Sequence, residues 1–249
     1  MTHPDQNLDL VRAQLAPGGT LRAALNLSNF LLNSGRTTAG EWLGVAPDMA
    51  RAIAQSLSVD VDFLPYPSPS EVADAADAGV WTVALIGADP IRARRIGFTA
   101  PYVEIESTYL VPPGSDLVTP ADVDQPGHTV AAYTGAAYEL WLRRNLKHAT
   151  LVAATSFDDS LQRCRGGGLS AVAGLRSRLT IDREGWPGSR VLDGNFMKVQ
   201  QAVGTQKDHA AGLEYLNGFV EKAKSAGLVA SWIATHKADG LSVAQDVEI

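Results

Sequence analysis

Arg92 is the side chain whose type and position point most clearly to chemistry. Its guanidinium offers a planar fork of donors that can meet a carboxylate through two parallel hydrogen bonds. It lies in a loop between an apolar run, Val83 to Ile86, with the length of a buried strand, and the alternating stretch Val103 to Val111, which is typical of a long strand. Because loops held between rigid strands often carry binding residues, we expect Arg92 to bind an anionic group. The alternative is a surface cation in a basic cluster with Arg94 and Arg95.

Two acids on the long strand form a second candidate. Glu104 and Glu106 are separated by one residue, so both project from the same face of that strand. Such a pair of carboxylates could bind a cation or act as a general acid and base. The alternative is the solvated outer face of a strand, where most strand acids lie.

Other kinds of site lack their sequence patterns. The five histidines are scattered without the H-x-x-x-H or H-E-x-x-H spacing of a zinc site, and there is no G-x-S-x-G nucleophile elbow. The run Gly166 to Gly168 is not followed by the Lys-Ser/Thr pair of a phosphate loop, so it predicts a turn that ends a helix. Cys164, the single cysteine, excludes an internal disulfide and predicts a small buried residue on a helix. We therefore expect no metal, no cofactor and no catalytic residue.

Composition limits the partners of the chain. Its 249 residues, 45% of them hydrophobic, are enough for two lobes of roughly 100 residues each. The net charge of −6, without a basic stripe, argues against nucleic acid and against an anionic membrane surface. No apolar run approaches the roughly 20 residues of a membrane span, so no membrane insertion is expected.

The elements that must position Arg92 alternate between strands and helices. This rhythm predicts an α/β fold with an open sheet, whose ligand crevices lie beyond the carboxyl ends of the strands. Thr119 is a candidate helix N-cap and predicts that one further helix begins there. Residues 237–249 are predicted to be a polar tail. Strands are predicted at residues 21–27, 59–64, 83–86, 103–111, 129–133, 151–153, 171–174, 191–192 and 199–204, and helices at residues 7–16, 45–56, 71–78, 138–146, 158–165, 176–183, 210–226 and 228–236.

A family resemblance adds to this pattern. The order of strand, loop, Arg92, six residues to Phe98, and then F-T-A-P-Y resembles the Arg and F-S-x-P-Y segment of extracellular solute-binding proteins of family 3. The resemblance extends from Gly19 to about His236. It implies a two-lobed type 2 periplasmic-binding-protein-like fold with a hinge of two crossover segments. Lobe 1 would comprise residues 1–110 and 200–249, and lobe 2 residues 111–199.

The same resemblance implies a ligand site in a cleft between the lobes. The matching Arg of the family grips the α-carboxylate of an amino acid, with help from the loop after the first strand and from a strand-to-helix turn in the second lobe, whose backbone N–H groups can face an anion. With Glu104 of the long strand added to the residues carried over from the family, the expected ligand-binding residues are Arg92, Asn26, Asn29, Phe30, Gly87, Ala88, Tyr133, Thr134, Gly135, Ala136, Gly174 and Glu104.

The partner for a ligand ammonium is missing from this set. Family members place a carboxylate just after the strand that corresponds to residues 171–174, where this chain has Gly174 and Leu175, and their first-strand acid reads here as Asn26. An ammonium enclosed without a counter-charge would cost several kcal/mol. The resemblance therefore implies a small carboxylate that is not a standard α-amino acid, unless Glu104 or Glu106 replaces the missing acid.

Three functions are compatible with these residues. The first is a solute-binding protein, a monomer or weak dimer, that captures a small organic anion and in an exported form delivers it to an ABC permease. The second is an enzyme on the same scaffold, with a dehydratase-like or lyase-like activity on a small carboxylate. The third is a regulatory protein with an empty, closed cleft.

The N-terminal residues bear on location. Residues 1–20 carry acids at Asp5 and Asp9 and show neither the basic region nor the apolar run of a signal peptide. Because this pattern is missing, the sequence as written predicts a cytoplasmic protein, although relatives are normally exported. If a signal has been removed, it predicts a periplasmic protein.

Overall fold

The chain divides into two compact units joined by two strands. The computed structural model describes residues 4–245. Unit 1 contains the residues up to Glu104 and from Gln200 onward, and unit 2 is Ile105–Val199. The boundaries fall inside strands β7 (Val103–Val111) and β12 (Met197–Gln206), between residues 104 and 105 and between residues 199 and 200. The sequence predicts the two boundaries at residues 110/111 and 199/200. The predicted α/β alternation is confirmed in both units.

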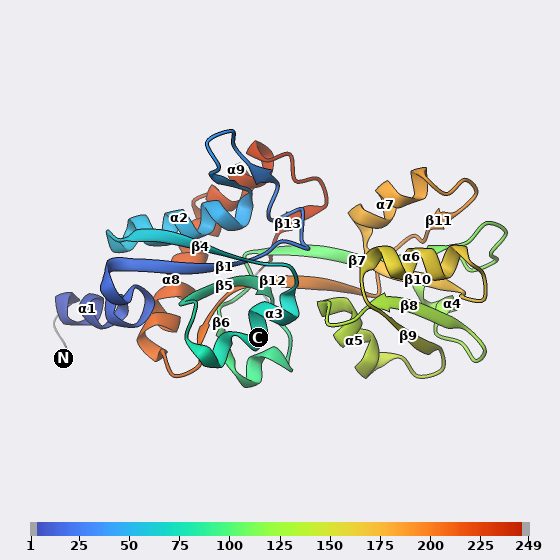
Figure 1. The fold of residues 1–249 in the computed structure, drawn as a ribbon, viewed down its shortest axis with the longest axis horizontal. Helices are drawn as coiled ribbons and strands as arrows, with labels where there is room; N and C mark the ends of the chain where they lie inside the picture. The colour runs from blue at the N-terminus through green and yellow to red at the C-terminus, as the bar shows by residue number, and fades with distance from the viewer. Residues whose placement is uncertain (1–3, 246–249) are drawn as a thin grey trace. The chain divides into compact units, whose positions relative to one another are not determined.

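Unit 1 is built on a mixed sheet. Strand β1 (Thr20–Asn26) pairs in parallel with β4 (Asp60–Tyr66) and β5 (Val83–Gly87), and β12 runs antiparallel to β5 (Figure 1). Two short strands extend it, β6 (Ile96–Phe98) against β12 and β13 (Leu241–Val243) against β7. Because β1, β4 and β5 are parallel, their carboxyl ends meet at one edge of this sheet.

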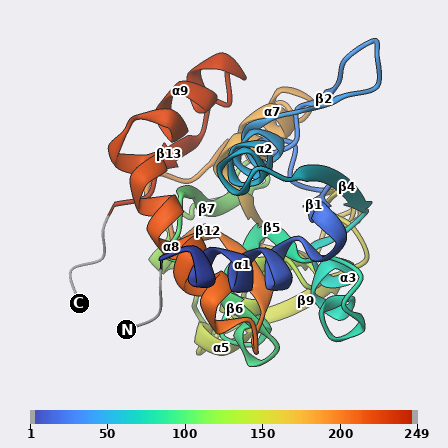
Figure 2. The ribbon, with the colours of Figure 1, turned by 90° about the vertical axis from the view of Figure 1, so that its left-hand side faces the viewer.

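The helices of unit 1 cover this sheet and one another. Helix α2 lies on β1, β4 and β5 with its apolar face inward, including fully buried Met49 and Ile53. Helix α3 also contacts β1, β4 and β5, whereas α1 packs on α8 and α9 on both α2 and α8 (Figure 2). The bounds are α1 Pro4–Leu15, α2 Val45–Leu57, α3 Pro69–Asp74, α8 Ala210–Ser225 and α9 Leu228–Thr235, with 3₁₀ turns at Pro17–Gly19, Ala76–Ala78 and Arg92–Arg94.

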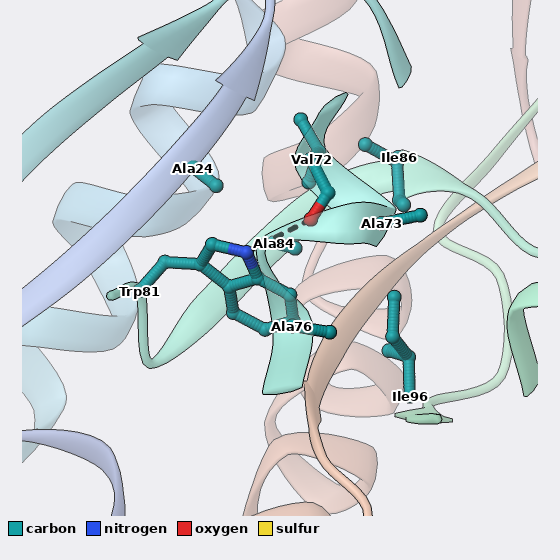
Figure 3. Packing of buried hydrophobic residues seen from close by; sticks show 8 residues of the cluster. All are labelled: Ala24, Val72, Ala73, Ala76, Trp81, Ala84, Ile86 and Ile96. Carbon is teal, nitrogen blue, oxygen red and sulfur yellow. Dashed lines mark hydrogen bonds between the residues drawn. The ribbon is translucent and has the colours of Figure 1, made fainter. Parts of the chain in front are cut away.

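Trp81 fills the core between β5 and α3. Its indole has no exposed surface and donates a hydrogen bond from Nε1 to the Val72 carbonyl oxygen at 3.0 Å (Figure 3). Alanine and isoleucine side chains surround the ring, from Ala24, Ala76, Ala84, Ile86 and Ile96. The small side chains leave room for the large ring, so this packing fixes α3 on the strand that leads to the Arg92 loop.

Two short features of unit 1 differ from the sequence prediction. Residues 28–44, expected to be loop and turn, include the hairpin of β2 (Gly35–Arg36) and β3 (Trp42–Leu43), where the Arg36 guanidinium stacks on the Trp42 ring at 3.7 Å. The expected polar tail contains β13 instead, because Leu241 and Ala244 are buried. Two or three ordered residues are too few to show a periodicity. The end of that tail, residues 246–249, lies outside the described residues.

Unit 2 is a smaller α/β layer. Strand β8 (Thr129–Tyr133) pairs in parallel with β9 (Thr150–Ala154) and β10 (Ala171–Leu175), and β10 runs antiparallel to β7. The short β11 (Arg190–Val191) also pairs with β7. Helices α4 Pro120–Val123, α5 Ala137–Asn145, α6 Phe157–Arg165 and α7 Arg176–Glu184 complete the unit. Across residues 4–245, no helix has the length and apolar character needed to cross a membrane.

Candidate functional site

The carboxyl edge of the unit 1 sheet gathers the first group of predicted site residues. Leu25 of β1 lies opposite Leu85 of β5 in a parallel register, so Asn26 and Gly87, near the ends of these strands, come to the same edge. This is the edge where open α/β sheets hold their ligands.

Arg92 lies at this edge in a buried position. Only 5% of the residue is exposed, and its Nη1 donates a hydrogen bond to the Gly87 carbonyl oxygen at 2.6 Å. Burial lowers the pKa of the guanidinium to about 10, opposed by the charge of Asp89, so the group stays protonated at neutral pH. Arg94 and Arg95 are exposed, and Arg95 pairs with two surface acids. Arg92 is therefore a buried cation and not part of a surface cluster.

Asp89 fixes the turn that carries Arg92. It is 5% exposed, its Oδ1 accepts the Ile91 N–H at 2.8 Å, and its carbonyl oxygen accepts the Ala93 N–H at 2.9 Å. The preceding residue, Ala88, is a predicted ligand-binding residue, and its N–H donates a hydrogen bond to the Gln200 carbonyl oxygen at 2.7 Å. The sequence prediction did not include Asp89 among the ligand-binding residues, although Asp before Pro is typical of an Asx turn.

The loop after β1 is held by its own amides. Asn26 accepts hydrogen bonds at Oδ1 from the Ser28 N–H and hydroxyl, and its carbonyl accepts from Asn33 Nδ2 at 2.8 Å. The Oδ1 atoms of Asn29 and Asn33 are buried and accept no hydrogen bond from the described residues. A buried side-chain oxygen is stabilised by a hydrogen-bond donor close to it. Asn33 was not among the predicted ligand-binding residues.

Exposed apolar side chains belong to the same two loops. Leu27 (39% exposed) and Phe30 (36%) follow β1, and Ile91 (41%) follows β5. The carboxyl edge of unit 1 therefore combines a buried cation with apolar surface, which is the usual make-up of a small-molecule site.

The two acids of the long strand have different partners. Glu104 belongs to unit 1, is 9% exposed, and accepts weak hydrogen bonds from Gln200 Nε2 at 3.4 Å and the Ser242 hydroxyl at 3.5 Å. Glu106 belongs to unit 2, where its Oε2 accepts from Arg176 Nε at 2.7 Å. Glu106 thus has Arg176 as its counter-charge. Glu104, the buried acid of the pair, lies in the unit that also carries Arg92.

In unit 2 the predicted anion-binding turn faces an acid of the chain itself. Gly135, with the left-handed φ of 79° that favours glycine, donates its N–H to Glu139 Oε2 at 3.0 Å. Glu139 is fully buried and its Oε1 pairs with Arg143. Glu139 in the first turn of α5 complements the helix dipole, a role that sequence reasoning missed.

The remaining residues of that turn lie around it. Tyr133 ends β8 and is half-buried, Thr134 is exposed and donates its N–H to the Ala154 carbonyl at 3.0 Å, and Ala136 is the buried N-cap residue of α5. Backbone groups at this turn are therefore already used in part by the protein.

Gly174 leaves no room for an acid. A Cβ at this buried position of β10 would lie 2.6 Å from Phe157 Cε2 and 3.1 Å from a Leu179 methyl. A carboxylate-bearing side chain cannot be placed there without moving Phe157.

The part of the chain that the structure describes was also searched for metal-binding and reactive thiol groups. No group of three or more His, Cys, Asp or Glu residues there could hold a metal ion. Cys164 is buried on α6, as predicted, and burial raises the pKa of its thiol to about 11, which disfavours the reactive thiolate.

Together, two α/β units joined by two strands, with a buried arginine at the carboxyl edge of one sheet, define a two-lobed ligand-binding class of protein. Residues 31–236 match the bacterial extracellular solute-binding proteins, family 3. The chain belongs to this family and has the type 2 periplasmic-binding fold, so the resemblance drawn from the sequence is confirmed.

Known proteins of two kinds are similar to this chain. A cyclohexadienyl dehydratase of Pseudomonas aeruginosa is 29% identical over 143 residues, which span 56% of this chain and 53% of that enzyme. An amino acid ABC transporter substrate-binding protein of Streptococcus pneumoniae, solved with L-arginine, has a TM-score of 0.71 at 23% identity and covers 91% of this chain and 98% of its own. An ancestral amino acid-binding protein, described as a precursor of cyclohexadienyl dehydratase, has a TM-score of 0.71 at 19% identity, with coverages of 92% and 97%.

Proposed function

We propose that this protein binds a small organic carboxylate other than a standard α-amino acid, with Arg92 as the residue that holds the carboxylate. The observation that carries the proposal is the burial of the Arg92 guanidinium at the carboxyl edge of the unit 1 sheet, positioned by the Gly87 carbonyl. A guanidinium positioned in a low-dielectric setting binds a carboxylate through charge-assisted hydrogen bonds.

The loops next to Arg92 favour a ligand whose atoms beyond the carboxylate are apolar. Leu27, Phe30 and Ile91 expose apolar surface in the loops that follow β1 and β5. Apolar contact adds roughly 25 cal/mol per Å² of surface removed from water, so an aryl or alkyl acid gains from both parts of the site.

The exclusion of an α-ammonium is argued from unit 2 by itself, at the position where the family resemblance implies a carboxylate. Gly174 has no side chain and no room for one, and the Gly135 amide is bound to Glu139. The S. pneumoniae relative is described as a substrate-binding protein of an amino acid ABC transporter. For this chain we propose an ABC permease as the partner, with a different ligand.

A ligand screen tests the proposal. Thermal unfolding is measured with aryl acids, alkyl acids, keto acids and α-amino acids, and with the amide of each acid as its uncharged control. We expect a carboxylate ligand to raise the unfolding temperature, by an amount that depends on the ratio of its concentration to its dissociation constant. The amide of the same acid should have no effect. Equal stabilisation by acid and amide would contradict recognition of the charge.

An enzyme on the same fold is the second candidate. The match to a dehydratase and the buried carboxylate of Glu104, which accepts hydrogen bonds from Gln200 and Ser242, favour it. Glu104 would then serve as general acid beside a ligand held by Arg92. Incubation of each stabilising acid with the protein, followed by NMR, separates the two functions, because an enzyme converts the acid and a binding protein leaves it unchanged.

A further inference from the structure

The turn that carries Arg92 has little apolar packing of its own. Of residues 90–95, all of which the structure describes, only Arg92 is buried, whereas Ile91, Ala93, Arg94 and Arg95 are exposed. Exposed side chains bury too little apolar surface to hold a backbone segment in one place. The position of the Arg92 guanidinium therefore depends largely on the polar contacts of the turn.

Arg95 connects the end of this turn with the region of α3. Its N–H donates a hydrogen bond to the Arg92 carbonyl oxygen at 3.0 Å. Its Nη2 donates to Oδ1 of Asp74, the last residue of α3, at 3.0 Å, and its Nη1 donates to Oδ2 of Asp77, in the 3₁₀ turn Ala76–Ala78, at 3.2 Å. One planar guanidinium thus bonds two carboxylates at once, which restricts its geometry more than a single ion pair does.

The two acids are attached to a rigid part of unit 1. Asp74 follows Ala73, and Asp77 follows Ala76, and both alanines are buried in the core cluster of Figure 3. Core side chains are closely packed, so the backbone at these positions has little freedom to move. Arg95 therefore attaches the Arg92 turn to a fixed support.

Lys207 provides a second attachment of the same turn. It follows β12, and its Nζ donates to the Ala93 carbonyl oxygen at 3.2 Å and to the Arg94 carbonyl oxygen at 3.4 Å. The last carbonyl groups of a short helical turn lack partners inside it, so this ammonium satisfies them. With Lys207 in place, we expect removal of the Arg95 side chain to loosen the turn without unfolding it.

We infer that Arg95 is a positioning residue, which holds the Arg92 guanidinium in place for the ligand through its bonds to Asp74 and Asp77. The inference rests on the proposed function and adds a further residue to the same site. A guanidinium that is already positioned loses less conformational entropy when it binds a carboxylate, so loosening the turn should weaken binding.

Calorimetric titration of 3-phenylpropionate tests the inference on the wild-type protein and on four variants. Arg95→Ala removes the connection, and Arg95→Lys keeps the charge but lacks the fork that bonds both acids. The double variant Asp74→Ala/Asp77→Ala removes both acceptors and leaves Arg95 in place. Arg94→Ala is the matched control, because Arg94 is an exposed arginine of the same 3₁₀ turn.

We expect Arg95→Ala and the double variant each to weaken binding by roughly fivefold, because each loses both ion pairs. Arg95→Lys should lie between Arg95→Ala and the wild-type protein, and Arg94→Ala should bind as wild type.

A purely electrostatic role of Arg95, as a cation that attracts the ligand, predicts different results. The double variant has two negative charges fewer and would then bind the anion more tightly, and Arg95→Lys would bind as wild type. Either result would overturn the inference, as would wild-type affinity of Arg95→Ala. If the double variant does not fold, the comparison of Arg95→Lys with the wild-type protein decides between the two roles.

Amide hydrogen exchange in the protein without ligand gives an independent measurement. The N–H groups of Ala93 and Arg95 are bonded inside the turn, to the carbonyl oxygens of Asp89 and Arg92. NMR should show several-fold faster exchange of these two amides in Arg95→Ala and unchanged exchange in the buried strand β5, since the loosening is local. Unchanged exchange of both turn amides would contradict a positioning role.

Failure of the proposed function has a different signature. If the wild-type protein does not bind 3-phenylpropionate saturably, or if Arg92→Ala binds it equally well, the Arg92 site and this inference are overturned together. If Arg92→Ala loses binding while Arg95→Ala binds as wild type, the inference alone is overturned.

Discussion

At the scale of single residues, Arg92 and Glu139 are two charged groups that the protein buries together with partners. Buried Arg92 has the Gly87 carbonyl and the charge of Asp89, and buried Glu139 has the Gly135 amide and Arg143. Such pairing offsets the cost of removing a charge from water. The partners are local in sequence, yet they depend on turn geometry that residue spacing alone does not reveal.

The hydrogen bonds of Asp159 predict that the protein loses stability in acid. Its carboxylate accepts hydrogen bonds from Arg163 Nε and from the Thr155 N–H and hydroxyl, which lower its pKa from 3.8 to about 2. Because the folded pKa lies below the unfolded one, the stabilisation is present above about pH 4 and is lost as the pH falls toward 2. We expect Asp159→Asn to lower the unfolding midpoint at pH 6 and to have little effect near pH 2.

Thermal unfolding of wild-type protein and variant across this pH range checks the expectation. Asp116→Asn, an exposed acid of the same unit, controls for the loss of one charge. A difference between wild type and Asp159→Asn that stays constant from pH 6 to pH 2 would contradict the assignment.

The burial of Trp81 predicts a large loss of stability when its side chain is shortened. Its buried ring fills the space against α3 and its N–H binds the Val72 carbonyl. Trp81→Ala should cost about 3–5 kcal/mol through the cavity, and Trp81→Phe about 1–3 kcal/mol through the unpaired carbonyl and the lost volume. Urea unfolding measures both; equal stability of the two variants would show that packing of the ring is not the main term.

At the scale of elements, apolar runs were sufficient to predict most of the structure. The strands Val103–Val111 and Thr129–Tyr133 have the predicted bounds, because several consecutive buried positions leave a clear pattern. The β2–β3 hairpin and β13 were missed, since each is only two or three residues long and depends on contacts distant in sequence. For β13 such a contact is the hydrogen bond from the Ala244 N–H to the Tyr102 carbonyl.

The start of α2 gives an element-scale prediction. Gly44 has a φ of 135°, and a Cβ there would lie 2.2 Å from the Leu32 carbonyl oxygen. Gly44→Ala should therefore destabilise the protein by about 2 kcal/mol or more, because neither the backbone angle nor the space suits a side chain. Gly218→Ala is the matched control: it lies inside α8 with open space around it and should stabilise by about 0.5–1 kcal/mol.

Urea unfolding of both glycine variants provides the comparison. A Gly44→Ala protein as stable as wild type would mean that the turn between Leu32 and α2 can adjust at little cost. Stabilisation by Gly218→Ala together with loss of stability in Gly44→Ala would confirm that the fold uses glycine for a specific approach at residue 44.

At the scale of the whole molecule, the family and the fold could be predicted because the Arg92 to Tyr102 segment and the α/β rhythm are both visible in the sequence. The candidate site could be predicted only in part. Arg92 was predicted from its loop between two strands and Asn26 from the family resemblance, whereas Asp89 and Glu139 act through hydrogen bonds to backbone amides. Such contacts follow from turn and helix-start geometry, which a single sequence specifies weakly.

The central claim is that the Arg92 guanidinium binds the carboxylate of a small ligand. Titration calorimetry with the most stabilising acid of the screen tests it on the wild-type protein, Arg92→Ala and Arg94→Ala. Arg94 is the matched control because it is an exposed arginine of the same 3₁₀ turn. The account predicts that Arg92→Ala, still folded, loses at least about 2 kcal/mol of binding free energy, roughly thirtyfold in dissociation constant, while Arg94→Ala binds as wild type. Equal affinity of Arg92→Ala and wild type for that acid would contradict it.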